Sequence, residues 1–435
     1  MNVSAINHSF TQHKPSFKSN ITFDIGGSQR EGSCKIYYAT SEKDDVIYTT
    51  KTTVNTLGKT RFENSADFKN QIVKKVKKVQ ANNVNNISDM GYPEEENTIK
   101  SMTIFIPSYT SGAFAYYLPN HKNNDDRPLK DLDFSDMKEL LIANGVKVSP
   151  DMRFMLLQDA MGTGLAVAQK LYNRGMLTKG KYYTTAITGG GCGITNIKMT
   201  SDDKVIIESS GSGYLSESMT LQKVSKVGAS APALIRNFCK SFGLNEEMQE
   251  DIQSCHKAEF VLNNPVEFKK DIATEKLKKL LLDTDKYEVL AENEKSYVIS
   301  VKKDYEEMYK RSQRNAIDKY CLAFARLAII KKNEGSNGLI ITGPLARAVN
   351  RTAKENYQIG ISDWVTGHLL GSFNTYELEK MQKTYNFQVF CDDRFALNDN
   401  TACKKLAHEA EFISPERGNW LEISTKYLKE QPESY

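Results

Sequence analysis

The sequence predicts an α/β protein built from two similar halves, and three observations carry this prediction. The chain of 435 residues is long enough for two domains of ordinary size. Apolar runs of strand length alternate with stretches whose apolar residues recur at helical spacing. Three of the apolar runs end in a glycine-rich turn, at residues 23–28, 187–193 and 340–345.

Composition and charge narrow the class of protein. Hydrophobic residues make up 40% of the chain and charged residues 26%, and the net charge is only +4. Neither a basic stripe nor an apolar stretch of the ~20 residues that span a membrane is present. The seven cysteines are scattered without a Cys-x-x-Cys pair, and the histidines lack metal-ligand spacing. We therefore expect a cytoplasmic protein with reduced thiols and with neither a nucleic acid nor a membrane as partner.

The predicted elements of the first half surround a hairpin. Residues 1–20 are expected to be a loosely attached arm, and residues 21–25 and 34–38 to be two strands with the glycine turn at their tip. A helix is predicted from Ser65, with apolar residues at the spacing of one helix face. Residues 82–98 and 120–133 are polar and are predicted to be loops, and residues 102–106 a buried strand ending at Pro107.

The predicted elements of the remaining chain, from the last strand of the first half onward, follow a similar plan. The strands expected here are residues 154–157, 182–187 and 338–341. The first is followed by a helix, and a second, longer helix contains residues 317–330. Residues 257–304 are charged and show no consistent period. A terminal helix is expected over residues 420–428.

The first glycine-rich turn carries residue types that suit a phosphate group and a metal ion. Glycine lets the backbone approach phosphate oxygens and point its N–H groups at them. Gly26, Gly27 and the Ser28 hydroxyl could hold terminal phosphate oxygens, and Asp24 could hold Mg²⁺, through water because Mg²⁺ keeps several waters. A tight hairpin with an exposed aspartate is the alternative interpretation.

The other two glycine turns also suit parts of a nucleotide. Residues 188–193 contain four glycines in six positions, more than a hairpin needs, which favours close approach of a ligand. Gly343 follows an apolar strand and precedes a helix, which suits an adenosine group near a helix N-terminus. An ordinary strand-to-helix turn would have the same sequence.

Asp159 is the candidate catalytic base. It follows an apolar strand, and the carboxyl ends of strands are where open α/β sheets bind ligands. A carboxylate there can accept the proton of a hydroxyl whose oxygen attacks a γ-phosphate, and phosphoryl transfer otherwise needs mainly positioning and charge neutralisation. Asp159 also suits the N-cap of the helix that follows, and the spacing does not separate the two roles.

In this order, the segments resemble the sugar kinase–Hsp70–actin superfamily, and most closely its ROK-family and glucokinase members. The likeness runs from about residue 20 to about residue 350. The segments that carry it are the phosphate motifs at 23–28 and 188–193, IFIPSYTSG at 104–112, LLQDAMGTGLAVA at 156–168, ASAPAL at 229–234 and the adenosine motif at 338–345.

The resemblance implies two RNase-H-like domains that close over ATP, Mg²⁺ and a sugar. The N-terminal lobe would comprise residues 21–158 and the C-terminal lobe residues 159–435, with the terminal helix returning to the N-terminal lobe. Asp159 would deprotonate a sugar hydroxyl, and the residues expected on the sugar are Asn120, Gln158 and Glu217. The residues expected on the nucleotide or its metal are Asp24 (the metal ligand), Gly26, Gly27, Ser28, Thr188, Gly189, Gly190, Gly191, Gly193 and Gly343.

The chain departs from the family pattern at four places. Gln158 stands where the family usually has a sugar-binding asparagine, and Gly190 where a threonine often stands. Residues 211–218 lack the histidine of the Glu-x-Gly-His sugar motif, so Glu217 is the nearest carboxylate. The Cys-x-Cys-Gly zinc loop is missing, and no structural zinc is expected.

We therefore predict an ATP-dependent kinase that acts on a hydroxyl of a hexose or amino sugar. A sugar and ATP are the expected partners, and the sequence leaves a homodimer open. Two alternatives remain. The incomplete sugar-side motif is compatible with a catalytically inactive sugar- or nucleotide-binding protein, or with a kinase for a non-sugar acceptor such as a small carboxylic acid.

Overall fold

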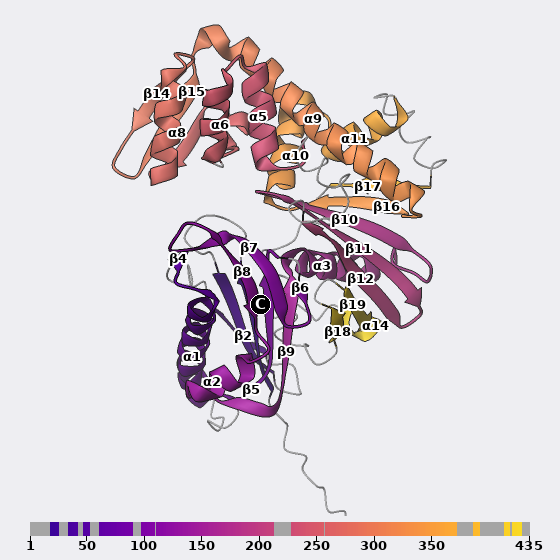
Figure 1. Ribbon diagram of the computed structural model, residues 1–435. Coiled ribbons are helices and arrows are strands. Elements are labelled where there is room, and N and C mark those ends of the chain that lie inside the picture. Colours follow the sequence, from indigo (N-terminus) through magenta and orange to yellow (C-terminus); the bar gives the residue numbers. More distant parts are fainter. Residues whose placement is uncertain are drawn as a thin grey trace, which may run out of the picture.

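Two mixed β-sheets organise the protein, as the computed structural model shows (Figure 1). The structure describes residues 18–25, 34–41, 47–52, 61–89, 97–108, 110–212, 228–255, 257–371, 386–391, 413–417 and 420–428. The architecture is α/β, as the sequence predicts.

The first sheet has five strands in the order β3-β2-β1-β5-β9. Three consecutive antiparallel strands are followed by two strands that run parallel to the first. The strands are β1 (Lys18–Ile25), β2 (Cys34–Ser41), β3 (Ile47–Thr52), β5 (Ile99–Ile106) and β9 (Val148–Gln158). Because β1 begins at Lys18, the last residues of the expected N-terminal arm belong to this strand.

The second sheet repeats this plan. Five of its seven strands follow the order β12-β11-β10-β16-β17, again with three antiparallel strands and then two parallel to the first. They are β10 (Tyr182–Thr188), β11 (Cys192–Ser201), β12 (Lys204–Ser212), β16 (Gly338–Thr342) and β17 (Gln388–Phe390). The strand order and directions therefore confirm two similar halves.

Two C-terminal strands extend the second sheet beyond β12. They are β18 (Ile413–Arg417) and β19 (Trp420–Ser424), and the short α14 (Thr425–Leu428) follows directly after β19. The prediction of a helix over residues 420–428 is therefore wrong for residues 420–424, which form β19. Alternate residues of β19, Leu421 and Ile423, are buried, which is the period of a strand with one covered face. The short helix packs on α3 and β19.

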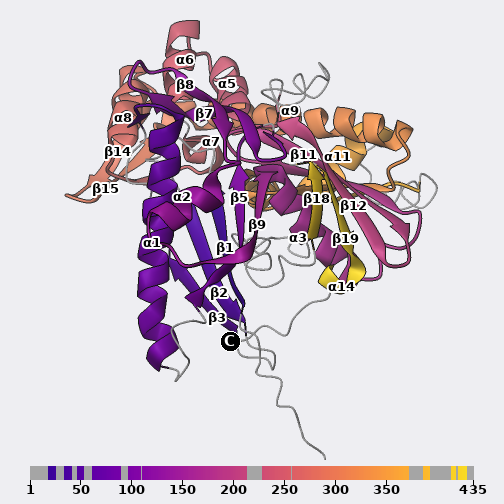
Figure 2. The same cartoon turned by 60° about the horizontal axis from the view of Figure 1, so that its bottom comes forward.

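The first sheet is covered by α1 (Ser65–Asp89), which begins where the sequence predicts. Its buried residues Phe68, Ile72, Val76 and Val79 join the core of this sheet. Figure 2 shows the helix along the sheet, with α2 (Met137–Ala143) beside it. The helix continues to Asp89, so the loop predicted from residue 82 begins too early; its Asn-rich second half offers neither glycine nor proline to end it.

A small sheet stands beside α1 and contains β4 (Arg61–Phe62), β6 (Thr110–Ser111), β7 (Phe114–Asn123) and β8 (Pro128–Asp133). The loop predicted over residues 120–133 is therefore wrong, because β7 and β8 form a hairpin there. Leu129 and Leu132 are buried although the flanking residues are charged. Tertiary burial of two leucines outweighs the polar composition in this segment.

The helix α3 (Asp159–Asn173) lies between the two large sheets (Figure 1). Its buried residues share one core with β5 and β9 of the first sheet and with β11 and β12 of the second. Two glycines allow this approach on both sides. A Cβ at Gly162 would lie 3.2 Å from Phe105 Cε1 in β5, and a Cβ at Gly164 would overlap Thr195 Cγ2 in β11.

The helices of the second half form one continuous core with the second sheet. The long α9 (Glu306–Asn333) follows the short 3₁₀ turn η2 (Lys303–Tyr305) and spans the helix predicted for residues 317–330. Trp364 donates a hydrogen bond of 3.1 Å from Nε1 to Asp318 Oδ1 of α9. The other helices are α5 (Ala231–Ser241), α6 (Glu246–Ser254), α7 (Glu259–Leu262), α10 (Pro344–Tyr357) and α11 (Ile361–Leu370).

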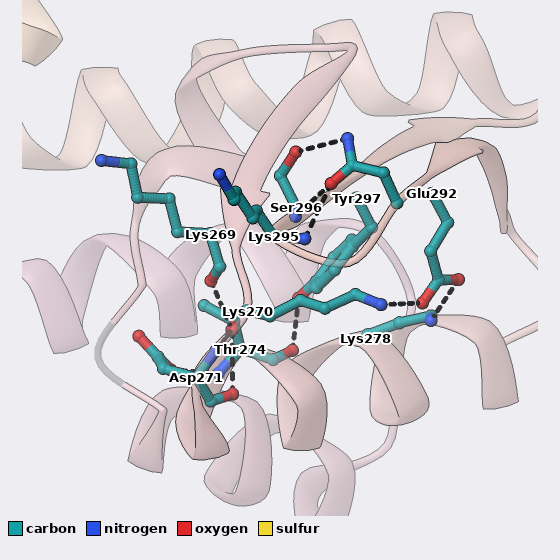
Figure 3. Close-up of polar contacts among 10 residues, drawn as sticks. Lys269, Lys270, Asp271, Thr274, Lys278, Glu292, Lys295, Ser296 and Tyr297 are labelled. Atoms are coloured by element: carbon teal, nitrogen blue, oxygen red, sulfur yellow. Dashed lines mark hydrogen bonds and ion pairs between the residues drawn. The ribbon is translucent and has the colours of Figure 1, made fainter.

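The segment that the sequence left unparsed folds as a small α/β unit. It contains β13 (Val266–Lys269), α8 (Ile272–Asp283), β14 (Tyr287–Glu292) and β15 (Ser296–Val301). Figure 3 shows the polar contacts that hold it together: Asp271 caps α8, the Tyr297 hydroxyl donates to the Thr274 carbonyl, and Lys270 and Lys278 both pair with Glu292.

Candidate active site

Asp159 and Asp24 lie at the same end of the first sheet although they belong to different elements. Asp24 pairs with Phe105 of β5, and the next residue of β5, Ile106, pairs with Gln158, which directly precedes Asp159. Asp24 is near the end of β1, and Asp159 is the first residue of α3, directly after β9. Burial, and after it the negative charge of Asp24, raise the pKa of the Asp159 carboxyl to about 7. One hydrogen bond, donated by the Ala160 N–H to Asp159 Oδ1 at 2.7 Å, acts against this shift.

Gln158 precedes Asp159 and is completely buried at the end of β9. It pairs in register with Ile106, the last residue of β5. Among the described residues, neither the amide oxygen nor the amide nitrogen of its side chain has a hydrogen-bond partner. A buried amide without partners loses the free energy of hydration, so a polar ligand at this position would stabilise the site.

The second glycine turn contacts the start of α3. Gly193 is the second residue of β11 and pairs with Ile187, and a Cβ on Gly193 would lie 3.0 Å from Ala160 Cβ. Thr195 Oγ1, two residues further on, donates to the Ala160 carbonyl at 2.9 Å. The turn and the helix that begins with Asp159 are therefore in direct contact.

The third turn contacts the second. Gly343 has φ +104°, and a Cβ there would lie 2.6 Å from the Thr188 carbonyl oxygen and 2.9 Å from the Thr188 nitrogen. Only glycine combines this backbone conformation with such a close approach. Thr188 is itself buried, and its hydroxyl lies 2.8 Å from the Tyr320 hydroxyl of α9. The Thr188 side chain is therefore bound to protein, and its hydroxyl is less available to a ligand than the sequence suggested.

The backbone of the second turn is partly free to bind a ligand. The Gly189 N–H donates to the Gly191 carbonyl at 2.9 Å, and the Gly189 carbonyl accepts from the Ala231 N–H at 2.8 Å. Within the described segments, no protein acceptor takes a hydrogen bond from the N–H groups of Gly190 and Gly191. Gly190 is exposed, and no heavy atom lies within 4 Å of the position of a Cβ there. These two N–H groups are the donors that could meet an anion.

A cavity of about 590 Å³ opens beside the third turn. Thr342 and Pro344, which flank Gly343, form its near end. The exposed face of α10 and Cys391, just after β17, line the rest. The cavity therefore lies at the carboxyl ends of two parallel strands, which is where open sheets of this type bind ligands. We name it the α10 cavity.

Some of the predicted site residues cannot be compared with the structure. Gly26, Gly27, Ser28 and Glu217 lie outside the described residues. Asn120 belongs to strand β7, but its side chain is likewise outside the description. The predicted residues that lie near one another are Asp24, Gln158, Asp159, Thr188, Gly189, Gly190, Gly191, Gly193 and Gly343.

Two supporting residues were missed at the level of sequence. Tyr320 lies within the helix expected over residues 317–330, and its hydroxyl lies 2.8 Å from the Thr188 hydroxyl. Thr195 follows the glycine turn and connects it to Ala160. Neither residue belongs to a motif, and each contact joins residues far apart in the chain, so no local pattern pointed to them.

The residues at this site fit a magnesium ion. Two carboxylates with close negative charges, one of them desolvated, are stabilised by a divalent cation. Mg²⁺ is held in many phosphate-binding sites by one or two carboxylates together with phosphate oxygens and water. In the described ranges, no group of three or more His, Cys, Asp or Glu side chains is placed to hold a metal ion. A magnesium ion at this site would therefore need phosphate oxygens and water as its other ligands.

Comparison with known proteins identifies the fold. A scan against protein-family models finds no match, and no curated protein matches the sequence. A glucokinase structure from Balamuthia mandrillaris, in complex with glucose, matches with a TM-score of 0.50 at 10% identity, over 90% of this chain and 94% of that chain. A Schistosoma mansoni hexokinase complexed with glucose matches with a TM-score of 0.48 at 10% identity, over 92% and 87%. A ROK family glucokinase from Streptomyces griseus matches with a TM-score of 0.37 at 12% identity, over 81% and 90%.

The protein thus has the two-domain α/β fold of a glucokinase. The likeness predicted from the sequence is confirmed at the level of the fold. At this identity the comparison concerns architecture, and the chemistry must be argued from the site. No helix in the described ranges combines the length and the apolar character needed to cross a bilayer.

Proposed function

We propose that this protein is an ATP-dependent phosphotransferase that phosphorylates a hydroxyl of a hexose or amino sugar, with Asp159 as the general base. The observation that carries the proposal is that four segments distant in the sequence come together. Asp24 lies near Asp159, the helix of Asp159 touches the turn of Gly193, and that turn touches Gly343. A base, a metal ligand and free backbone donors in one place are the parts that phosphoryl transfer requires.

The environment of Asp159 suits a base. Its pKa of about 7 leaves a large ionised fraction at neutral pH while keeping the carboxylate basic enough to take a proton efficiently. In the proposed reaction, Asp159 accepts the proton of the sugar hydroxyl as that oxygen attacks the γ-phosphorus of ATP. The bond between the γ-phosphorus and the bridging oxygen breaks, and ADP leaves.

Asp24 and the second turn have supporting roles in this proposal. Asp24 would hold Mg²⁺, which supplies charge neutralisation for the phosphates when it is bound. The N–H groups of Gly190 and Gly191 would donate to phosphate oxygens, and Gly343 would border the adenosine. The near end of the α10 cavity, at Thr342 and Pro344, leaves room for that group.

Gln158 would contact the acceptor sugar. Its buried amide offers two donors and an acceptor, and none of them is used within the described part of the protein. A sugar hydroxyl can both donate and accept, so it matches this amide better than an apolar group would. Asn120 and Glu217 stay proposed sugar ligands on the strength of the sequence resemblance, while Gly26, Gly27 and Ser28 stay proposed ligands of the terminal phosphate.

The direct test is a panel of hexoses and amino sugars with ATP and Mg²⁺, scored by ADP release. The variant Asp159→Asn should lower kcat about 10²- to 10⁴-fold, because a lost general base removes stabilisation of the transition state. Its affinity for ATP should stay within a few-fold of the wild type. The matched control is Asp202→Asn in the exposed β11–β12 turn, which should leave both quantities unchanged.

Equal ADP release by wild type and Asp159→Asn would exclude Asp159 as the base. Binding of sugar and ATP without ADP release from the wild type would identify a catalytically inactive binding protein instead. ADP release that depends on a small carboxylic acid and not on any sugar would identify a kinase with a different acceptor.

A further inference from the structure

The α10 cavity carries an excess of positive charge that the proposed reaction does not use. Arg347, Arg351 and Lys354 line it, and Glu355 is the only carboxylate among its lining residues. The formal charge of these side chains is +2, three cations less one carboxylate. Among the residues that the structure describes, neither Arg351 nor Lys354 has an ion-pair partner. These two charges are available to a ligand.

The cations are arranged in a row by the helix. Positions 347, 351 and 354 recur at the spacing of one helix face, and the opposite face, with Leu345 and Val349, is buried in the core. Seven residues of α-helix rise about 10 Å, so the row extends well beyond the size of a single phosphate group. Lys354 therefore lies at the far end of the row from the Gly343 turn.

The helix α10, which carries this row, is held in place by two hydrogen bonds of Asn350. Asn350 Nδ2 donates to the Cys391 carbonyl at 3.0 Å, and the Ile361 N–H donates to Asn350 Oδ1 at 2.9 Å. These two bonds fix α10 against the end of β17 and the start of α11. The cavity of about 590 Å³ falls within the range of about 300 to 1,000 Å³ that is usual for small-molecule sites.

We propose that the α10 cavity binds a second anionic ligand, a small molecule with two or more phosphate groups, separately from the phosphate donor at the glycine turn. Arginine side chains match phosphate geometry with paired N–H donors, and lysine adds a point charge. Arg351 and Lys354 lie about one helical turn apart along α10, which suits two linked or spaced phosphates better than one. This inference uses neither Asp159 nor the Gly189–Gly193 turn. The near end of the cavity is the proposed adenosine position, so the second ligand is placed along Arg351 and Lys354, and the titration with saturating ATP separates the two sites.

The test is calorimetric titration of the full chain with two probes, inorganic tripolyphosphate and fructose 1,6-bisphosphate, each without and with saturating ATP and Mg²⁺. The variant Arg351→Gln/Lys354→Gln removes two cations of the row. The matched control, Lys319→Gln/Arg326→Gln, removes two exposed cations from α9 and so changes the net charge equally.

We expect saturable binding of at least one probe to the wild type, to the control and to Asp159→Asn, and retained binding in the presence of ATP. The Kd of the cavity variant for the probe should be at least about tenfold higher than that of the wild type. Each lost charge-assisted hydrogen bond to phosphate weakens binding by about a factor of ten. The tighter of the two probes indicates whether the phosphates are linked directly or carried on a sugar.

Three results would overturn the inference. The first is the absence of saturable binding of both probes to the wild type. The second is equal weakening in the cavity variant and the control, which would indicate only long-range charge. The third is displacement of the probe by ATP together with an equal loss of ATP affinity in the cavity variant, which would make the cavity part of the donor site.

Discussion

Asp159 shows how much of the candidate site depends on the environment of one side chain. As a free aspartate it would be fully ionised at neutral pH, but burial and the charge of Asp24 raise its pKa to about 7. The sequence placed Asp159 at the end of a strand and suggested a base or a helix cap. In the structure, the Asp159 side chain accepts a hydrogen bond from the adjacent Ala160 N–H and does not cap the N–H groups further into α3.

This shift predicts how stability depends on pH. The folded pKa is higher than the value of about 3.9 in the unfolded chain, so the folded state binds the proton more tightly. The corresponding stability is present below about pH 4 and is lost as the pH rises through about 7. Asp159→Asn cannot ionise, so its free energy of unfolding should exceed that of the wild type increasingly from pH 4.5 to pH 8, with an upper limit of about 4 kcal/mol.

Urea unfolding at the two pH values measures this difference. Asp202→Asn in the exposed turn serves as the control and should not change the free energy of unfolding at either pH. A difference between Asp159→Asn and wild type that stays constant from pH 4.5 to pH 8 would contradict a raised pKa in the folded protein.

At the scale of elements, the second and third glycine turns contain glycine for different reasons. Gly343 combines a positive φ with contact to the Thr188 backbone, so its glycine is needed for folding. Gly190 faces open space, and folding alone does not explain its glycine. The sequence could not separate these cases, because both residues simply follow an apolar strand.

A pair of alanine variants tests this distinction. Gly343→Ala should lower the free energy of unfolding by about 2 kcal/mol or more, because the methyl group meets backbone atoms that cannot move aside. Gly190→Ala should change it by less than about 0.5 kcal/mol, yet weaken ATP binding several-fold by separating the N–H groups from the phosphates. Urea unfolding and nucleotide titration measure the two effects; unchanged ATP affinity in Gly190→Ala would count against phosphate at this turn.

Elements with a strong local pattern could be predicted from the sequence, and elements defined by distant contacts could not. The β1–β2 hairpin and the start of α1 follow from alternation and from Ser65. Tyr320 meets Thr188 across 132 residues, which no local pattern reports. The small unit from Val266 to Val301 has strands of four to six residues, too short to show a period among its charged neighbours. The cations of α10 look like an ordinary solvated helix face until the cavity beside them is seen.

At the scale of the whole molecule, the repeated strand order explains where the site lies. Asp24 lies near the end of β1, and the Gly189–Gly193 turn follows β10, the corresponding strand of the second sheet. Asp159 directly follows β9, the last strand of the first sheet, and starts the helix that packs against both sheets. The proposed boundary between residues 158 and 159 would therefore place the proposed base, Asp159, at the junction of the halves.

This arrangement predicts movement of the halves when ligands bind. ATP, Mg²⁺ and an accepted sugar together should lower the radius of gyration measured by X-ray scattering, because closure excludes water from the γ-phosphate. Asp159→Asn should show the same decrease, since closure depends on binding and not on proton transfer. Identical scattering curves with and without ligands would exclude closure as part of the mechanism.

The positions of the two tryptophans bear on how melting experiments with this protein are interpreted. Trp364 in α11 and Trp420 in β19 both belong to the half that is built on the second sheet. Indole emission therefore reports directly on that half, while the five-stranded sheet and α1 contain no tryptophan to report their loss. An optical transition followed through these rings would describe only part of the unfolding, and a backbone signal such as far-ultraviolet circular dichroism is needed to detect the rest.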